Sequence, residues 1–319
     1  RFKDDCTRML TSDLHLASHK PLDQPIGANV GTDPNHPYLH KWRVIADQSD
    51  QDKFDLAAGL QSATEDLLKS VFDNVLELFG DERYLCLSGG VTLNSVFTGK
   101  LLKWYEDRLD GIFVTPTPHD GGLTLGSAQY IWHQVLDNPR VKWQDHASPY
   151  LGEIYTEESV KVAIESKSDC VIQSHAELSD VVELLDDQKI VSVFSAGSES
   201  GRRALGNRSI LVDPRSTTMK DTINEKVKHR QWYRPFAPSI LESEASDWFE
   251  DYQESPYMQF VLKFKKDKVD LVPAVVHLDG TARLQTVRET DNKWYYDFLQ
   301  AWHKASGVPI ILNTSFNDR

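Results

Sequence analysis

Two short apolar segments in the first half of the chain are each followed by a glycine-containing loop and a segment with helical periodicity. YLCLS (84–88) leads through SGGVTLN into residues 91–106, and GIFVTP (111–116) leads through HDGG into residues 123–136. Short, fully apolar runs are typical of strands buried on both faces, and alternating strands and helices produce parallel pairing. The sequence therefore predicts a mainly parallel sheet covered by helices in this half.

The pattern of strands and helices restarts after residues 147–158, which we interpret as a linker. Helices are predicted at 54–80, 157–166, 178–187, 217–229 and 295–306, and strands at 170–174, 190–195, 209–214, 259–266, 283–289 and 308–315. Some of these strands alternate polar and apolar residues and others are apolar throughout, which indicates a mixed sheet. We predict an α/β protein of two domains, 1–147 and 148–319, because 319 residues is long for one core.

Composition restricts the classes of function. The net charge is −13 and no segment approaches the roughly 18 apolar residues of a membrane span. The acidic balance argues against sequence-independent nucleic-acid binding, which needs a basic face. Cys6, Cys86 and Cys170 are far apart, which suits a reducing cytoplasm. No signal peptide or initiator Met is visible, and we expect a piece of a longer protein.

One segment departs from this acidic balance. Residues 202–234 contain nine Lys or Arg and three acidic residues, a surplus of six positive charges. A run of charge usually covers a solvated face. Here the basic residues are interleaved with GRRALGNRS and RPFAPS, whose apolar residues should be buried. Cations held beside packed segments indicate a pocket for phosphate or carboxylate, which Arg can bind with two parallel hydrogen bonds. Arg283, Ser315 and Asn317 are expected to join this pocket from neighbouring strands.

Two loops after the first strands are further candidates. Gly89 and Gly90 allow backbone N–H groups to approach an anion at a helix N-terminus, although a tight turn without a ligand explains them equally well. Asp120, followed by two glycines, suits a metal or ribose contact, and a helix-capping role is an equal alternative. His36 and His40 have the spacing of a metal pair on a helix, but Pro37 favours two loop histidines.

Seven blocks resemble, in order, those of the NodU/TobZ-type O-carbamoyltransferases. They are LSGGVTLN, DGGLTLGSA, SPYLGEIY, ESGRRALGNRSILVDPR, NEKVKHRQWYRPFAPSIL, HLDGTARLQTV and PIILNTSFN, within residues 54–317. The resemblance implies the C-terminal half of an actin-like ATPase (Kae1-like) domain in residues 1–147. It implies a YrdC-like domain with a mixed twisted sheet in residues 148–319. The YrdC-type fingerprint, KxR followed by SxN, corresponds to Lys228, Arg230, Ser315 and Asn317.

The resemblance also implies an activity and its ligands. The YrdC-like domain would make carbamoyl-adenylate from ATP and carbamoyl phosphate, and the Kae1-like domain would transfer the carbamoyl group to a hydroxyl. Residue by residue, it implies catalytic roles for Lys228, Arg234 and Arg203, ligand binding by Arg230, Arg283, Ser315 and Asn317, and a metal contact for Asp120. The glycine loop adds Gly89 and Gly90 as expected ligand-binding residues. The expected divalent metals are magnesium with ATP and iron in the Kae1-like site.

Departures and alternatives accompany this interpretation. The family usually has Pro where this chain has Arg202, which is either a tolerated change or an additional ligand contact. The resemblance places the family's metal histidines in an N-terminal half, which we expect to precede the part of the protein given by this sequence. Alternative functions are threonylcarbamoyl transfer to tRNA and non-catalytic nucleotide binding. Acceptors considered are a small molecule, a sugar or a modified nucleotide; we also consider a homodimer and expect no membrane contact.

Overall fold

The computed structural model describes residues 49–140, 149–167 and 175–317, and the chain divides into two units after Glu82. The first unit contributes helix α3 (Asp50–Leu78), whose start is capped by the Ser49 side chain accepting a hydrogen bond from the Asp52 N–H. The prediction of a helix at 54–80 is confirmed. The predicted strand at 170–174, Cys6, Cys170, His36 and His40 lie outside the described residues.

The second unit, Arg83–Arg319, begins with the predicted parallel pair. Strands β1 (Tyr84–Leu87) and β2 (Gly111–Val114) pair in parallel, with Tyr84 opposite Gly111 and Leu87 opposite Val114. Between them lie a 3₁₀ turn, η1 (Gly90–Leu93), and helix α4 (Ser95–Trp104), which the Asn94 side chain caps. After β2 come η2 (Asp120–Gly122), α5 (Leu123–Tyr130) and a π-helical turn, η3 (Ile131–Val135).

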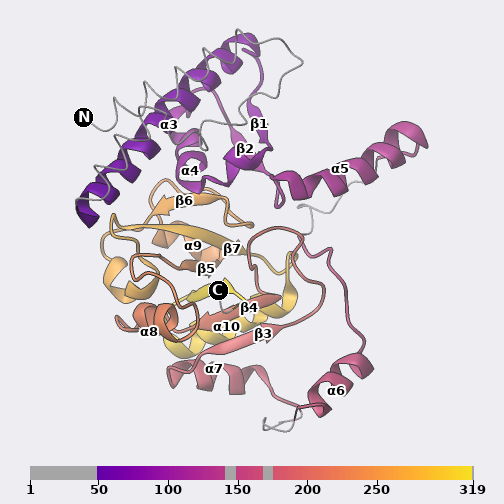
Figure 1. Cartoon of the computed structure of the whole chain (residues 1–319), viewed down its shortest axis with the longest axis vertical. Coiled ribbons are helices and arrows are strands. Elements are labelled where there is room, and N and C mark those ends of the chain that lie inside the picture. Colours follow the sequence, from indigo (N-terminus) through magenta and orange to yellow (C-terminus); the bar gives the residue numbers. More distant parts are fainter. Residues whose placement is uncertain (1–48, 141–148, 168–174, 318–319) are drawn as a thin grey trace. The chain divides into compact units, whose positions relative to one another are not determined.

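The other described strands of this unit form a six-stranded mixed sheet (Figure 1). Its strands are β3 (Val191–Phe194), β4 (Arg208–Val212), β5 (Ala237–Leu241), β6 (Phe260–Lys263), β7 (Thr281–Val287) and β8 (Ile310–Ser315), in the order β3-β4-β8-β5-β7-β6. Among the strand pairs that the structure describes in this sheet, only β5–β7 is parallel. The predicted mixed α/β architecture is confirmed, whereas the family-specific domain names and the boundary at 147/148 stay predictions.

Strand β5 was not predicted from the sequence. It occupies the centre of the sheet between β8 and β7, and all five of its residues are buried. Pro235 and Pro238 favour a stiff irregular segment, since proline cannot donate a ladder hydrogen bond. Pro238 nevertheless lies opposite Leu312 in the antiparallel β5–β8 pair. Burial of this apolar segment in the tertiary structure outweighs the ladder hydrogen bond that Pro238 cannot donate. Ala237 and Ser239 continue the strand on either side of Pro238.

Helices complete the packing around the sheet. They are α6 (Glu157–Glu165), α7 (Leu178–Asp186), α8 (Met219–Lys226), α9 (Glu242–Trp248) and α10 (Lys293–Ser306). Helix α10 packs on β5 and β8 through Tyr295, Phe298, Leu299 and Trp302, all of them buried. It ends at Gly307, whose φ of 77° is the left-handed cap expected from the sequence.

Helix α4 links the parallel pair to the large sheet by packing on β6. The Thr98 Oγ1 hydroxyl donates a 2.5 Å hydrogen bond to the Gln259 carbonyl, and Gln253 Nε2 donates to the Gly99 carbonyl at 3.0 Å. A Cβ at Gly99 would overlap the carbonyl oxygen of Val261, so the close approach requires glycine. Among the helices that the structure describes, none is long and apolar enough to cross a membrane.

Candidate anion and transfer sites

Five arginines line one cavity of about 510 Å³, which we call the arginine pocket. They are Arg202, Arg203, Arg230, Arg234 and Arg283. Arg202 and Arg203 lie in the loop between β3 and β4, Arg230 and Arg234 in the loop between α8 and β5, and Arg283 in β7. Ser315, at the end of β8, lines the same cavity. The structure thus brings together five basic residues, four from the 202–234 segment and one distant in sequence.

Strand order explains this convergence. Ser209 near the start of β4 pairs with Ser315 at the end of β8, and Ala237 at the start of β5 pairs with Asn313. Strand β7 runs parallel to β5, so its early residue Arg283 lies near the start of β5. The loops before β4 and β5, the start of β7 and the end of β8 therefore lie together at the same end of the sheet's strands.

The arginine pocket carries uncompensated positive charge. Among the described residues, none of its five arginines has a carboxylate partner. Burial and the guanidinium groups of Arg203 and Arg230 lower the pKa of Arg283 to about 9. Burial and Arg202 lower the pKa of Arg203, and burial and Arg234 lower that of Arg230. Such repulsion is relieved when an anion binds between the cations.

Two of the five arginines, Arg230 and Arg283, are positioned rather than merely exposed. Arg230 Nε donates to Asn224 Oδ1 at 2.7 Å, and its guanidinium carbon lies 4.5 Å from the Phe236 ring centre. Arg283 Nε is buried and has no hydrogen-bond partner among the described residues. An unpartnered buried donor beside a cavity is costly unless a ligand satisfies it, and phosphate oxygens suit that role.

Lys228 occupies a different position from the arginines. It is buried, and its Nζ donates to the carbonyl oxygens of Ser315 and Asn317 at 2.5 and 2.7 Å and to Asn317 Oδ1 at 2.8 Å. Lys228 is not among the residues lining the arginine pocket. The structure therefore joins the KxR and SxN segments through this ammonium group, which fixes the end of β8 where Ser315 meets the pocket.

The remaining basic residues of the 202–234 segment include two with structural contacts. The Arg208 guanidinium lies 3.6 Å from the Phe194 ring centre and donates to the carbonyls of Ser195 and Ala196. Arg215 forms ion pairs with Asp213 and Asp186 at 2.7 and 2.6 Å. The surplus of charge in the sequence therefore combines pocket arginines with arginines that hold loops together.

Glu199 organises the loop that carries Arg202 and Arg203. Its Oε1 accepts hydrogen bonds from the backbone N–H groups of Leu205, Asn207 and Arg208 at 2.7, 3.0 and 3.3 Å. Within the same loop Gly206 has a φ of 118°, and a Cβ there would lie 2.6 Å from the Tyr295 ring. Both constraints fix the course of the backbone that carries Arg202 and Arg203.

We expect Glu199→Ala to lower the free energy of unfolding by about 2–3 kcal/mol, because it removes a charged acceptor shared by three amides. Phosphate affinity should fall as well, since Arg203 loses its fixed position. Chemical denaturation and phosphate titration measure the two effects. Glu199→Gln is the matched control, because its amide oxygen still accepts and should preserve part of both properties. Equal stability of the Ala variant and the unaltered protein would contradict the role assigned to Glu199.

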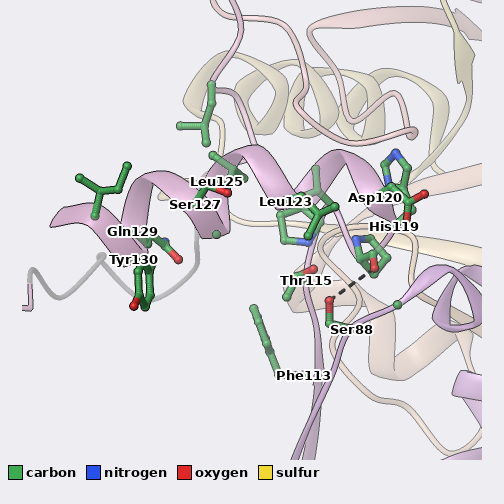
Figure 2. A pocket seen from close by; sticks show the side chains of 18 residues that line it. Ser88, Phe113, Thr115, His119, Asp120, Leu123, Leu125, Ser127, Gln129 and Tyr130 are labelled. Atoms are coloured by element: carbon green, nitrogen blue, oxygen red, sulfur yellow. Dashed lines mark hydrogen bonds between the residues drawn. The ribbon is translucent and has the colours of Figure 1, made fainter. Parts of the chain in front are cut away.

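A second cavity of about 920 Å³ lies at the ends of β1 and β2. Figure 2 shows Ser88, Thr115, His119 and Asp120 grouped near one end of this cavity, with α5 along it. Gly89 also lines it, with a φ of 106° and its N–H donating to the Pro118 carbonyl at 2.5 Å. The structure thus brings Gly89 and Asp120 together, whereas Gly90 begins η1 and does not line the cavity.

The fit of this second cavity to a metal is partial. The described residues contain no group of three or more His, Cys, Asp or Glu side chains placed to hold an ion. His119 and Asp120 are adjacent, and the buried Nδ1 of His119 has no hydrogen-bond partner in the described part of the chain. An imidazole nitrogen and a carboxylate suit iron better than magnesium. Asp120 therefore stays a predicted metal ligand.

Several residues that line the arginine pocket were not singled out from the sequence, and Ser95 and His277 are among the polar ones. Ser95 comes from the first turn of α4, and His277 from the turn before β7. The signal for His277 was its place six residues before Arg283 in HLDGTARL. Nothing in the sequence marked Ser95, because its approach depends on how α4 packs against β6.

Comparison with known proteins identifies the family. The family described as Carbamoyltransferase C-terminus matches residues 182–319, and Carbamoyltransferase N-terminus matches residues 22–129. Relatives include nodulation protein NolNO of Sinorhizobium fredii, 42% identical over 83% of this chain and 39% of its own length. Nodulation protein NolO of Bradyrhizobium diazoefficiens is 39% identical over 83% of this chain and 48% of its own length.

Nodulation protein U of Sinorhizobium fredii is a more distant match, at 36% identity over 74% of this chain and 40% of its own length. The chain spans less than half the length of these three curated relatives. Both parts of the family are matched in order, and the five arginines and Ser315 of the arginine pocket lie within the matched C-terminal part. The chain therefore belongs to the carbamoyltransferase family.

Proposed function

We propose that this protein is an ATP-dependent O-carbamoyltransferase that forms carbamoyl-adenylate in the arginine pocket and passes the carbamoyl group to an acceptor hydroxyl. The observation that carries the proposal is the convergence of five arginines without a carboxylate partner among the described residues, in a protein of net charge −13. Both substrates are polyanions, and fixed cations that need no reorganisation are the main means of stabilising charge on phosphate.

Carbamoyl-adenylate would form in two steps. One carbamoyl phosphate, one ATP and one water would give carbamoyl-adenylate, inorganic phosphate and pyrophosphate. Water would first hydrolyse carbamoyl phosphate to carbamate and inorganic phosphate. A carbamate oxygen would then bond to the α-phosphorus of ATP as the bond from that phosphorus to pyrophosphate breaks. Arg203, Arg230, Arg234 and Arg283 would bind the phosphate oxygens in both steps. Lys228 would act through Ser315 and Asn317, whose positions it fixes.

In the second step an acceptor hydroxyl would attack the carbamoyl carbon and AMP would leave. We assign this step to the cavity beside β1 and β2, where Ser88, His119 and Asp120 offer polar groups. A divalent metal bound by His119 and Asp120 would supply a Lewis acid for this transfer. We favour a small molecule or a sugar as the acceptor over a polynucleotide, because the acidic chain repels nucleic acid.

The test is pyrophosphate release by the purified protein supplied with ATP, magnesium and carbamoyl phosphate. Release that requires carbamoyl phosphate is the expected result. Release that requires threonine and bicarbonate instead would favour the threonylcarbamoyl pathway. Binding of ATP with no turnover under any of these conditions would favour a non-catalytic nucleotide-binding role.

We expect Arg234→Ala to reduce carbamoyl phosphate-dependent pyrophosphate release by roughly 100-fold or more, because a fixed cation leaves the pocket. Steady-state measurement of released pyrophosphate gives the effect. Lys266→Ala is the matched control, since Lys266 is an exposed cation that does not line the pocket. Equal activity of the Arg234→Ala variant and the control would contradict the assignment of this cavity.

A further inference from the structure

His277 lies beside Arg283 in the lining of the arginine pocket. It begins the turn that leads into β7, and its backbone N–H donates to the Thr281 carbonyl at 2.8 Å. The ring is half-buried, and its Nδ1 lies 3.1 Å from Thr281 Oγ1. Nε2 has no hydrogen-bond partner among the described residues and is the ring atom left for a ligand.

The hydrogen bonds around His277 fix its tautomer. Thr281 Oγ1 donates to Asp279 Oδ1 at 2.7 Å, and the Thr281 N–H donates to the same oxygen at 3.1 Å. Burial raises the pKa of Asp279, but these hydrogen bonds outweigh it and the pKa is lowered overall. The side chain is therefore an ionised carboxylate, which accepts hydrogen bonds and cannot donate them. Because the Thr281 hydroxyl has one hydrogen, its oxygen accepts from His277 Nδ1–H. The lone pair of the neutral ring is therefore on Nε2.

The surroundings also keep the ring neutral. Burial lowers the pKa of His277 to about 4, and the positive charges of Arg283 on β7 and Lys220 on α8 act in the same direction. Asp279, in the same turn, opposes them. At neutral pH His277 is therefore a hydrogen-bond acceptor inside a pocket whose five arginines can only donate.

An acceptor beside phosphate-binding arginines matches a particular ligand chemistry. Phosphate oxygens accept hydrogen bonds and so pair with the arginines, not with Nε2. In carbamoyl phosphate the NH₂ group is separated from the phosphorus only by the carbonyl carbon and the bridging oxygen, so a donor accompanies the phosphate. Acetyl phosphate has nearly the same shape but carries a methyl group there, which cannot donate.

We infer that His277 Nε2 accepts a hydrogen bond from the carbamoyl NH₂ group and selects carbamoyl phosphate over acyl phosphates. This assignment rests on the proposed function, because it takes carbamoyl phosphate as the ligand of the arginine pocket. The arginines bind the phosphate group that carbamoyl phosphate and acyl phosphates share, and His277 distinguishes the group attached to that phosphate. Thr281 and Asp279 are positioning residues that hold the acceptor nitrogen in the correct tautomer.

Calorimetric titration tests the assignment with three probes: carbamoyl phosphate, acetyl phosphate and inorganic phosphate. The unaltered protein should bind carbamoyl phosphate roughly 10-fold or more tightly than acetyl phosphate, because the methyl group leaves the acceptor unpaired. His277→Leu should bring this ratio close to one. Its affinity for inorganic phosphate should stay within about twofold, which also shows that the variant is folded and its pocket intact.

Two further variants separate recognition from packing. His277→Gln retains an acceptor and should restore part of the preference, whereas a merely structural role would make Gln and Leu equivalent. Thr281→Val removes the tautomer constraint and should reduce the preference by less than His277→Leu. Unchanged preference in His277→Leu would overturn the inference.

These measurements also distinguish this inference from the proposed function. If the unaltered protein releases pyrophosphate but all three variants keep its preference, the inference fails and the proposed function stands. If the unaltered protein shows neither preference nor carbamoyl phosphate-dependent pyrophosphate release, both fail.

Discussion

Arg283→Met is expected to abolish carbamoyl phosphate-dependent pyrophosphate release and, at the same time, to stabilise the fold. Activity should fall by roughly 10²–10³-fold or more, because the innermost cation of the arginine pocket is lost. Stability should rise by about 1–3 kcal/mol, because an apolar side chain replaces a buried charge without a carboxylate partner among the described residues. Pyrophosphate assays and thermal unfolding, at roughly 2–4 °C per kcal/mol for a unit of this size, measure both effects.

The sign of the pH dependence follows from the lowered pKa of Arg283. The folded pKa of about 9 lies below the ordinary value of 12.5, so the charged group destabilises the fold below pH 9 and does so less as pH rises above it. The gain from Arg283→Met should therefore be constant between pH 6 and pH 8. A gain that changes across that window would contradict the origin assigned to it.

The control for Arg283 is Arg215→Met, which should have the opposite effect on stability. Arg215 pairs with the fully buried Asp213, so its removal leaves a buried carboxylate without its cation. Arg215 does not line the pocket. If both substitutions destabilise the protein to the same extent, then Arg283 is held by interactions that match those of an ion pair, and its charge is not available for a ligand.

Lys228→Met is the second substitution with a large expected effect. It should lower the free energy of unfolding by about 3 kcal/mol, because the acceptors of Ser315 and Asn317 lose a buried cation. Phosphate affinity should fall with it, since Ser315 lines the pocket. Chemical denaturation and phosphate titration measure the two quantities.

Lys226→Met provides the matched control for Lys228. Lys226 is an exposed residue of the last turn of α8, only two positions away, and its replacement should change stability by less than about 0.5 kcal/mol. If Lys228→Met retains phosphate affinity at the level of this control, the proposed link between Lys228 and the pocket is wrong. A loss of stability alone would then define Lys228 as a structural residue.

Local patterns in the sequence were sufficient for most elements of the fold. The parallel pair β1–β2 was predicted because apolar runs, glycine loops and helical periodicity are properties of neighbouring residues. The end of α10 at Gly307 was predicted for the same reason. Strand β5 was missed because two prolines argue against a strand locally, and only its place between β7 and β8 supplies the compensating burial.

For the candidate site, the sequence alone determined that positive charge is concentrated in residues 202–234 and that Arg283 and Ser315 belong with it. Charge and residue type are properties of the sequence itself. The ordered sequence blocks that resemble the carbamoyltransferase family indicate which residues belong to one site. Only the tertiary structure decided that four of these arginines share a cavity with Arg283, that Lys228 is buried against Ser315 and Asn317, and that His277 faces the same ligand space. The physical reason is that strand order brings together segments distant in sequence, and burial then determines which cations lack a counter-charge.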